Sequence, residues 1–483
     1  MSQKCPYCGK EFKRLSAHKC PMAPSEDKEE KVQEEKIKEK TIAKSKPKEK
    51  ISPKRPAKPK ISQNLKDLIG KTQAETNIGL VGHVDHGKTT LVKAICGEWT
   101  DRFSDEQERG ISIKLGYANS TILKCSACNK YMTYWMTEQA RKKGEKRYKC
   151  IFCKGELEFI RKISFVDAPG HSVLMSTMLS GSSLMDGALL LIAADEVCPQ
   201  PQTREHLAAL EIANIKNVVI VQNKIDSVSE ERAIENFNEI KNFIKGSIAK
   251  SAPIIPVSAV FNANIELIIE YFEKNIPTPQ LNEKDDFRFL IARSFDINKP
   301  GTEIDKLLGG VIGGSITQGI VKTGDDIEMR PGLRGKSGYE PILAKAVSLS
   351  QGNIRLEEAK PGGLIGIGTE LDPFLTKSDS LIGNLGGAPG TLPEILTEVK
   401  LDVHLLDQVI GAEEPIEVEK IKHNERLLLV NGTMRTAGVV TKITKDFVLM
   451  KLSIPLCAEK GSLISISRVI KKRFRLIGYG YIK

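Results

Sequence analysis

The distribution of apolar and polar residues divides the chain into regions of different period. From about residue 75, short apolar runs alternate with amphipathic segments of helical length. The pattern predicts strands at residues 77–81, 162–166, 187–194, 217–221 and 253–257, and helices that include 89–96, 202–213 and 230–244. Such alternation is typical of a parallel sheet covered by helices on both faces. We therefore expect residues 75–279 to form an α/β domain.

After residue 279 the apolar residues recur with a period of two, and glycine turns interrupt the runs. This pattern predicts two all-β barrels, at residues 280–393 and 394–483. Residues 21–74 are rich in lysine, glutamate and proline, at least as far as residue 60. A tract of this kind buries too little apolar surface to offset its ordering entropy, so we expect a disordered charged linker.

The segment Gly82-His83-Val84-Asp85-His86-Gly87-Lys88-Thr89 fits the phosphate-loop pattern G-x-x-x-x-G-K-[ST]. Glycine permits a sharp turn whose amides face phosphate oxygens, and the following helix adds its positive N-terminal end. Lys88 would bind the β- and γ-phosphates, and the Thr89 hydroxyl would ligate Mg²⁺. A predicted strand before the motif and a predicted helix after it support this interpretation over a chance glycine-rich turn.

Two further segments fit the parts of a nucleotide switch. In Asp167-Ala168-Pro169-Gly170-His171, the aspartate would hold Mg²⁺ through water and the Gly170 amide would sense the γ-phosphate. His171 would orient the attacking water, unless it is an ordinary hydrogen-bonded loop histidine. In Arg109-Gly110-Ile111-Ser112, Ser112 would offer a hydroxyl to Mg²⁺ when the loop closes; the alternative is a plain surface loop.

Base selection is predicted at Asn223-Lys224-Ile225-Asp226, which follows an apolar strand. The Asp226 carboxylate can accept two hydrogen bonds from the N1 and N2 edge of guanine, which adenine cannot provide. Ser258 and Ala259 would support the base. Taken in this order along the chain, the motifs predict an α/β P-loop GTPase domain followed by two all-β barrels.

Cysteine spacing predicts one structural zinc site and indicates a second. Cys125, Cys128, Cys150 and Cys153 form two C-x-x-C pairs inside the α/β region, in an insert at residues 123–157, and four thiolates suit tetrahedral zinc. Buried free cysteines are the alternative. In residues 1–20, a small zinc finger would use the ligand set Cys5, Cys8, His18 and Cys20, unless these are free thiols in a disordered leader.

Bulk composition narrows the class of protein. The 483 residues carry a net charge of +11, with a pI near 9.0, which suggests an anionic partner such as RNA. Six of the ten cysteines stand in C-x-x-C pairs, which favours zinc in a reducing compartment over disulfides. The sequence has no long apolar run for a membrane span and no secretory signal at Met1, so a cytoplasmic location is expected.

The motifs resemble those of the tRNA-delivering translational GTPases, through residues 82–90, 109–118 and 167–171. Three stretches narrow the resemblance to the family of translation initiation factor 2 gamma subunits in its archaeal form: residues 180–186, 198–203 and 292–302. The terminal run Arg475–Gly480 fits as well. The resemblance covers about residues 75–483 and says nothing about residues 1–74.

The resemblance implies a GTPase that binds methionylated initiator tRNA in the GTP state, assembles with alpha and beta subunits, and acts on the small ribosomal subunit. It implies nucleotide contacts at Asp85, His86, Gly87, Lys88, Thr89, Thr90, Asn223, Lys224, Asp226, Ser258 and Ala259. The family usually has threonine where this chain has Ser112; the hydroxyl survives, but closure of that loop is expected to be looser.

Two alternatives stay open at the level of sequence. One is an elongation factor or a selenocysteine-specific factor, against which residues 198–203 and the four-cysteine insert argue. The other is a scaffold that binds nucleotide without turning it over, against which Asp167 and His171 argue. No arginine finger is identifiable in the sequence, so hydrolysis would depend on a partner.

Overall fold

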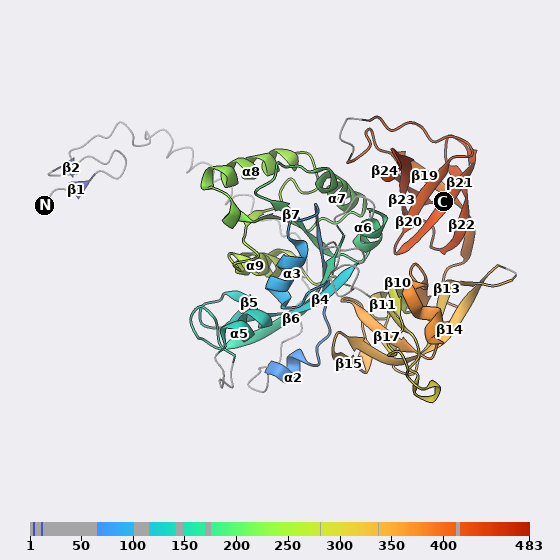
Figure 1. Ribbon diagram of the computed structural model, residues 1–483, viewed down its shortest axis with the longest axis horizontal. Coiled ribbons are helices and arrows are strands. Elements are labelled where there is room, and N and C mark those ends of the chain that lie inside the picture. Colours follow the sequence, from blue (N-terminus) through green and yellow to red (C-terminus); the bar gives the residue numbers. More distant parts are fainter. Residues whose placement is uncertain are drawn as a thin grey trace, which may run out of the picture. The chain divides into compact units, whose positions relative to one another are not determined.

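The computed structural model describes residues 65–100, 115–141, 148–169, 175–280, 282–336, 338–411 and 416–483, together with two short strands near the N-terminus. The chain divides into two compact units, Met1–Ser62 and Gln63–Lys483. In the first unit, β1 (Gln3–Lys4) pairs antiparallel with β2 (Glu11–Phe12). The second unit holds all the remaining described elements (Figure 1).

The α/β domain is built on one seven-stranded sheet with the order β5-β4-β6-β3-β7-β8-β9. Its strands are β3 (Thr76–Gly82), β4 (Gly116–Cys125), β5 (Tyr131–Thr133), β6 (Leu157–Asp167), β7 (Gly187–Ala193), β8 (Val218–Asn223) and β9 (Ile254–Pro256). Its helices are α2 (Leu65–Ile69), α3 (Lys88–Cys96), α5 (Tyr134–Ala140), α6 (Met175–Ser182), α7 (Pro201–Ile212), α8 (Glu230–Phe243) and α9 (Ile265–Asn275).

Burial on both faces explains why these strands read as continuous apolar runs. In β7, Leu189 and Leu191 belong to the core that α3 and α9 cover, whereas Leu190 and Ile192 belong to the core on the other face. Every residue of β3, β7 and β8 is buried. Strands buried on both sides are the normal state of a parallel sheet, and all the strands and helices predicted by residue range in this domain are present.

One edge of the sheet differs from the expected all-parallel arrangement. β4 pairs antiparallel with both β6 and β5, while β6, β3, β7, β8 and β9 run parallel to one another. β4 and β6 are long, and their far ends carry the cysteine insert: Cys125 pairs with Leu157. The cysteine insert joins the end of β4 to the start of β6 at the same end of the sheet, so the two strands run antiparallel.

The first barrel follows α9. Six strands close on one another because β13 pairs with β14 as well as with β18. Its elements are β10 (Arg288–Phe295), β11 (Val311–Gln318), β12 (Val321–Lys322), β13 (Asp326–Arg334), β14 (Tyr339–Gln351), β15 (Ile354–Leu356), β16 (Glu358–Ala359), β17 (Ile365–Thr369), α10 (Pro373–Thr376) and β18 (Leu385–Gly387). Alternate residues fill its core, among them Phe289, Ile291 and Ile327.

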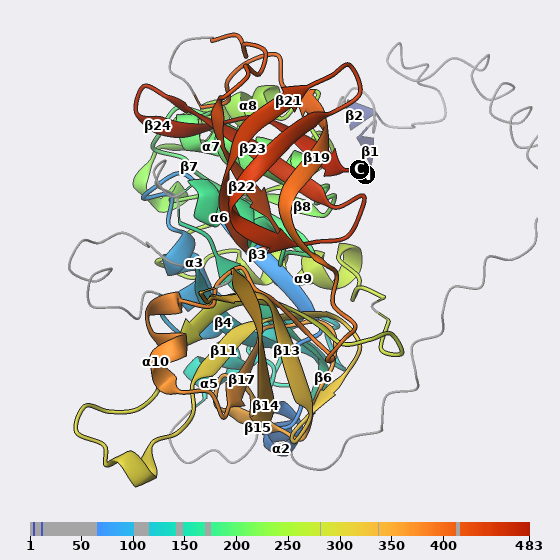
Figure 2. The ribbon, with the colours of Figure 1, turned by 90° about the vertical axis from the view of Figure 1, so that its right-hand side faces the viewer.

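The second barrel is closed, with the strand order β19-β22-β21-β20-β23-β24 (Figure 2). Its strands are β19 (Ile395–Leu405), β20 (Arg426–Asn431), β21 (Met434–Ile443), β22 (Val448–Cys457), β23 (Leu463–Ile470) and β24 (Arg473–Ile482). The α/β domain and two barrels expected from the sequence are therefore present. Within the part of the chain that the structure describes, no helix has both the length and the apolar composition needed to cross a lipid bilayer.

Two arginines of the second barrel contact helices of the α/β domain. Arg475 of β24 forms an ion pair with Glu205 of α7, and both side chains are largely buried. Arg435 of β21 donates to the hydroxyls of Thr177, at 3.1 Å, and Ser176, at 3.4 Å, on α6. The second barrel is therefore attached to the helices on one face of the sheet.

The first barrel contacts the α/β domain just before β3 and just before β4. Arg293 of β10 pairs with Asp379 at 2.9 Å and also donates to the Leu115 carbonyl at 3.2 Å. Gln73, just before β3, donates to the carbonyls of Lys360 and Gly362 and accepts from the Lys360 amide. These bonds hold the first barrel against the start of β3 and of β4.

Candidate nucleotide and zinc sites

The phosphate loop lies between β3 and α3, as the motif predicts. Gly87 caps α3 with a φ of 87°, a conformation that favours glycine, and Asp85 also has a positive φ. A Cβ at Gly87 would lie 2.3 Å from the Asn223 side-chain nitrogen, so the position has no room for another residue. The loop is therefore shaped by its glycine and by contact with the motif that follows β8.

Lys88 and Thr89 are in place for a phosphate and a metal ion. The Lys88 ammonium donates to the carbonyls of Gly82, at 3.1 Å, and His83, at 2.6 Å, which holds it over the loop. The Thr89 hydroxyl donates to Asp167 Oδ2 at 2.9 Å. Thr90 is half-buried on the first turn of α3.

Asp167 ends β6 and is fully buried. Its Oδ2 also accepts a hydrogen bond of 2.6 Å from Thr100. A hydroxyl beside a carboxylate is the kind of oxygen donor set that Mg²⁺ takes in proteins, usually with several waters kept on the ion. Thr89 and Asp167 thus fit a Mg²⁺ site, and the ion would supply positive charge against the phosphate oxygens.

Asn223 connects the base-recognition motif to the phosphate loop. Its amide nitrogen donates to the His86 carbonyl at 2.9 Å, and its Oδ1 accepts from the Ala259 amide at 3.1 Å. The side chain is almost completely buried. One residue therefore joins three segments that lie far apart in the sequence and meet at the carboxyl edge of the sheet.

The other base-recognition residues surround Asn223. Lys224 has a positive φ and its ammonium pairs with Asp195 at 3.1 Å. Asp226 lies in the turn Ile225–Ser227 with its side chain exposed to solvent, where a base can reach it. Ser258 is buried, and its hydroxyl accepts from the Phe261 amide at 3.3 Å. The structure thus brings the predicted guanine motif and the predicted Ser-Ala loop together.

Two buried histidines support the phosphate loop, and no motif in the sequence indicates the second. His86 Nδ1 donates to the Leu191 carbonyl at 2.9 Å, and its Nε2 lies 3.3 Å from the Glu196 carboxylate. Burial lowers the pKa of His86 to about 4, so the ring is neutral near pH 7 and its contact with Glu196 is the weaker of the two. His206 of α7 accepts a 2.7 Å hydrogen bond from the Gly82 amide at Nδ1, and burial lowers its pKa well below 6.5.

Several predicted residues lie outside the described part of the chain. These are Gly170, His171 and the segment 109–112 with Ser112, together with the N-terminal ligand set Cys5, Cys8, His18 and Cys20. Of their flanking residues, Thr100 is bonded to Asp167, Leu115 is bonded to Arg293, and Met175 begins α6. The roles assigned to these residues stay predictions.

The four cysteines of the insert form one cluster at the far end of β4 and β6. Their sulfur atoms all lie within 4.8 Å of one another, with Cys125 to Cys153 at 3.4 Å and Cys128 to Cys150 at 3.6 Å. Four thiolates bound tetrahedrally at about 2.3 Å from zinc stand roughly 3.8 Å apart. The cluster is therefore compatible with zinc, which would supply a cross-link between two loops.

Backbone geometry shapes both cysteine loops in the same way. Asn129 and Lys154 each follow a C-x-x-C pair and have φ near 60°. Each donates its amide to the carbonyl of the first cysteine of its own pair, at 3.0 Å. Burial opposes ionisation of Cys125, but the amides of Cys128 and Ala127 lower the pKa of its thiol to about 7. The thiolate that a metal requires is thus favoured at this position.

Comparison with known proteins agrees with this geometry. The model of the elongation factor Tu GTP-binding domain matches residues 73–278, and the model of the C-terminal region of initiation factor eIF2 gamma matches residues 397–482. The chain is 54% identical over 415 residues to translation initiation factor 2 subunit gamma of Pyrococcus furiosus, covering 85% of this chain and 98% of that protein. It is 53% identical, with the same coverage, to the subunit of that name from Methanocaldococcus jannaschii.

Two solved structures share the fold at low sequence identity. A bacterial selenocysteine-specific elongation factor, EF-Sec, matches with a TM-score of 0.62 and 22% identity, over 84% of this chain and 58% of that one. Elongation factor SelB of Methanococcus maripaludis, in complex with the GTP analogue GppNHp, matches with a TM-score of 0.61 and 21% identity, over 86% and 79%. These likenesses show the fold alone.

A phosphate loop, a buried aspartate at the end of β6 and a guanine motif, on a domain followed by two β-barrels, define a translational GTPase. Within that class, the length and identity of the match to the curated relatives decide the family. The chain belongs to the translation initiation factor 2 subunit gamma family, and it is a GTP-binding GTPase subunit of that factor.

Proposed function

We propose that this GTPase carries methionylated initiator tRNA to the small ribosomal subunit, as one subunit of a heterotrimer with alpha and beta subunits in the cytoplasm. The observation that carries the proposal is a cavity of about 800 Å³ between the GTPase domain and the first barrel. The relatives named as subunits of initiation factor 2 support the choice of tRNA and of partners.

The cavity has the chemistry that the acceptor end of an aminoacylated tRNA requires. Aromatic side chains of Tyr117 and Trp135 offer surfaces on which a base can stack. Lys162 would supply positive charge for a phosphate, although burial lowers its pKa to about 8. Arg293 also lines the cavity, where it is paired with Asp379, and the wall carries the carboxylates of Glu98 and Glu138. Phe295 and Val311 provide apolar surface for a methionine side chain.

Nucleotide state would reach this cavity through the first switch segment, residues 109–112. That segment lies between Thr100, which is bonded to Asp167, and Leu115, which is bonded to Arg293 of the cavity wall. GTP would order the segment through Ser112 and Mg²⁺, and GDP would release it. Linked sites commonly couple by about 1–3 kcal/mol, so the tRNA should bind roughly 5- to 150-fold more tightly in the GTP state.

Hydrolysis would be in-line attack of water on the γ-phosphate, with His171 orienting the water and the Gly170 amide sensing the phosphate. Asp226 would select guanine, and Lys88 with Mg²⁺ at Thr89, Ser112 and Asp167 would neutralise phosphate charge. His171→Ala should therefore leave GTP binding near normal and slow ribosome-stimulated turnover. Normal turnover in a complete initiation reaction would remove His171 from this role.

The affinity for methionylated initiator tRNA, measured with a GTP analogue and with GDP in the presence of the alpha subunit, tests the proposal. Repeating the measurement with an elongator aminoacyl-tRNA separates an initiation factor from an elongation or selenocysteine-specific one. Equal affinity in the two nucleotide states, or for the two tRNAs, would refute the switch-coupled carrier. GTP turnover with ribosomes and partners distinguishes it from a nucleotide-bound scaffold.

A further inference from the structure

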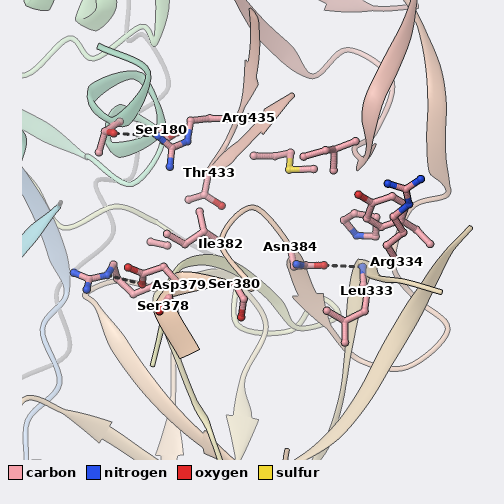
Figure 3. Close-up of a pocket in the computed structure, with 18 of the residues that line it drawn as sticks. Ser180, Leu333, Arg334, Ser378, Asp379, Ser380, Ile382, Asn384, Thr433 and Arg435 are labelled. Atoms are coloured by element: carbon pink, nitrogen blue, oxygen red, sulfur yellow. Dashed lines mark hydrogen bonds and ion pairs between the residues drawn. The ribbon is translucent and has the colours of Figure 1, made fainter. Parts of the chain in front are cut away.

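A second cavity, here called the central pocket, lies where the GTPase domain meets both barrels (Figure 3). Its volume is about 650 Å³. Thr177 of α6 lines it from the GTPase domain, Asp379 and Asn384 from the first barrel, and Thr433 and Arg435 from the second. The tRNA proposal makes no use of this pocket, although Arg293 lines both cavities.

The charge of the central pocket is unbalanced. Asp379 is the one carboxylate among the described residues that line it, and its Oδ1 already accepts from Arg293 Nε, at 2.9 Å, and from the Ser294 amide, at 3.1 Å. Two further guanidinium groups, Arg334 and Arg435, line the pocket. No carboxylate in the described part of the chain lies within ion-pair distance of either one.

Arg435 is the more informative of these two groups. It is largely buried; burial lowers its pKa, and the charge of Asp379, a carboxylate that already pairs with Arg293, raises it. Its recorded hydrogen-bond acceptors are the neutral hydroxyls of Thr177 and Ser176. A buried cation is costly unless an anion compensates it, so an anion from outside the chain would be strongly favoured at this end of the pocket. Figure 3 places Arg435 beside α6, on the opposite side of the view from Arg334.

The rest of the central pocket is lined by fixed polar groups and by apolar side chains. Asn384 accepts from the Gly332 amide at 2.7 Å and donates to the Leu381 carbonyl at 3.2 Å, so its amide is fixed (Figure 3). Thr433 adds a hydroxyl, while Ile382 and Leu333 add apolar surface. A volume of this size, with apolar walls and a few fixed polar groups, is typical of small-molecule sites, which span roughly 300–1,000 Å³.

We propose that the central pocket binds a small phosphorylated molecule, whose phosphate accepts hydrogen bonds from Arg435 and whose hydroxyl-bearing body lies against Thr433 and Asn384. Arg334 stands at the exposed rim, where its charge attracts the anion. Because the ligand would contact all three domains at once, its binding favours the arrangement of domains seen here and raises the temperature of unfolding.

Calorimetric titration of the full chain tests this site, with saturating GDP and Mg²⁺ so that the phosphate loop is filled. The probes are inorganic phosphate and glycerol 3-phosphate, with glycerol as the uncharged control. Inorganic phosphate and glycerol 3-phosphate should each show one saturable site, and the two affinities tell whether free phosphate or a phosphorylated metabolite fits better. Arg334→Gln should weaken binding severalfold. Arg435→Gln should weaken it roughly tenfold or more, because a charge-assisted hydrogen bond is lost.

Arg355→Gln is the matched control, because Arg355 is exposed on the first barrel and does not line the pocket. If Arg435→Gln fails to fold, Thr433→Val takes its place and should also weaken binding. The proposal is overturned if neither phosphate probe shows saturable binding to the GDP-filled protein. It is also overturned if the pocket variants bind the probes as tightly as Arg355→Gln does.

Discussion

Near the C-terminus, Lys471, Lys472, Arg473 and Arg475 form a basic cluster. Replacing Arg475 by glutamine tests whether this residue of the cluster supports the fold or contacts RNA. Arg475 pairs with Glu205, and the two side chains are 13% and 1% exposed. Burial raises the pKa of Glu205, whereas the charge of Arg475 lowers it. Removing the guanidinium leaves the buried Glu205 carboxylate of α7 without its ion-pair partner. Breaking a buried pair in this way costs about 3–5 kcal/mol, so Arg475→Gln should destabilise the protein by about that amount.

The assay is urea unfolding of the GDP-bound full chain, followed by the fluorescence of its two tryptophans, Trp99 and Trp135, both in the GTPase domain. Glu205→Gln should cost a similar amount. The Glu205→Gln, Arg475→Met pair should lose much less than the sum of the single changes, because both charges leave the interface together. Lys472→Gln is the control, since Lys472 lies exposed in the turn between β23 and β24.

The opposite result would favour a role for Arg475 in binding RNA. If Arg475→Gln unfolds at the same urea concentration as the native chain, the ion pair does not stabilise the domain arrangement. If that variant also loses about one unit of salt dependence in tRNA binding, Arg475 contacts a phosphate instead.

Three further predictions concern the site. Asp226→Asn should weaken GTP binding by about 1–3 kcal/mol, because a carboxylate that accepts from guanine is lost; unchanged affinity by nucleotide titration would remove Asp226 from base selection. Burial holds the pKa of His206 well below 6.5 in the folded state, so below pH 6.5 the unfolded chain binds a proton that the folded chain does not. The contribution of the neutral His206 to stability is therefore fully present above pH 6.5 and is lost as the pH falls below that value. His206→Gln should flatten that fall in urea unfolding at pH 7 and pH 5, and an equally steep fall in the variant would contradict the assignment. Cys125→Ser should lower the zinc content found by elemental analysis while GTP binding persists; native protein free of zinc with intact thiols would refute the site.

Local motifs carried most of what the sequence predicted correctly. The strand before Gly82, the helix at Lys88 and the guanine motif after β8 are each set by residues close in the chain. The buried runs of β7 and β8 are continuous because both faces of the sheet are covered, and the sequence shows that directly. Paired cysteines likewise predicted a cluster that the fold assembles from two distant loops.

Long-range pairing was beyond the sequence. The sequence of β4 shows neither a period of two nor a continuous apolar run, because Gly116, Asn119 and Ser120 stand among its apolar residues. No strand was therefore expected there. His206 looks like one more residue of an amphipathic helix until α7 packs beside Gly82. Arg475 belongs to a run of basic residues in the sequence, and its partner Glu205 lies 270 residues earlier in the chain, so the ion pair could not be predicted.

Thr100 and Leu115 stand on either side of the residues proposed to form the first switch, and each of them is held by a hydrogen bond. Thr100 donates to the same oxygen of Asp167 that accepts from Thr89, and Leu115 accepts from Arg293 of the first barrel. A metal ion that recruits Thr89 and Asp167 would compete with Thr100 for that oxygen. Binding of the ion would then weaken the hydrogen bond of Thr100 to Asp167, while Leu115 stays bonded to Arg293 of the first barrel. Magnesium concentration, as well as the identity of the nucleotide, would thereby set how firmly the chain is held at Thr100.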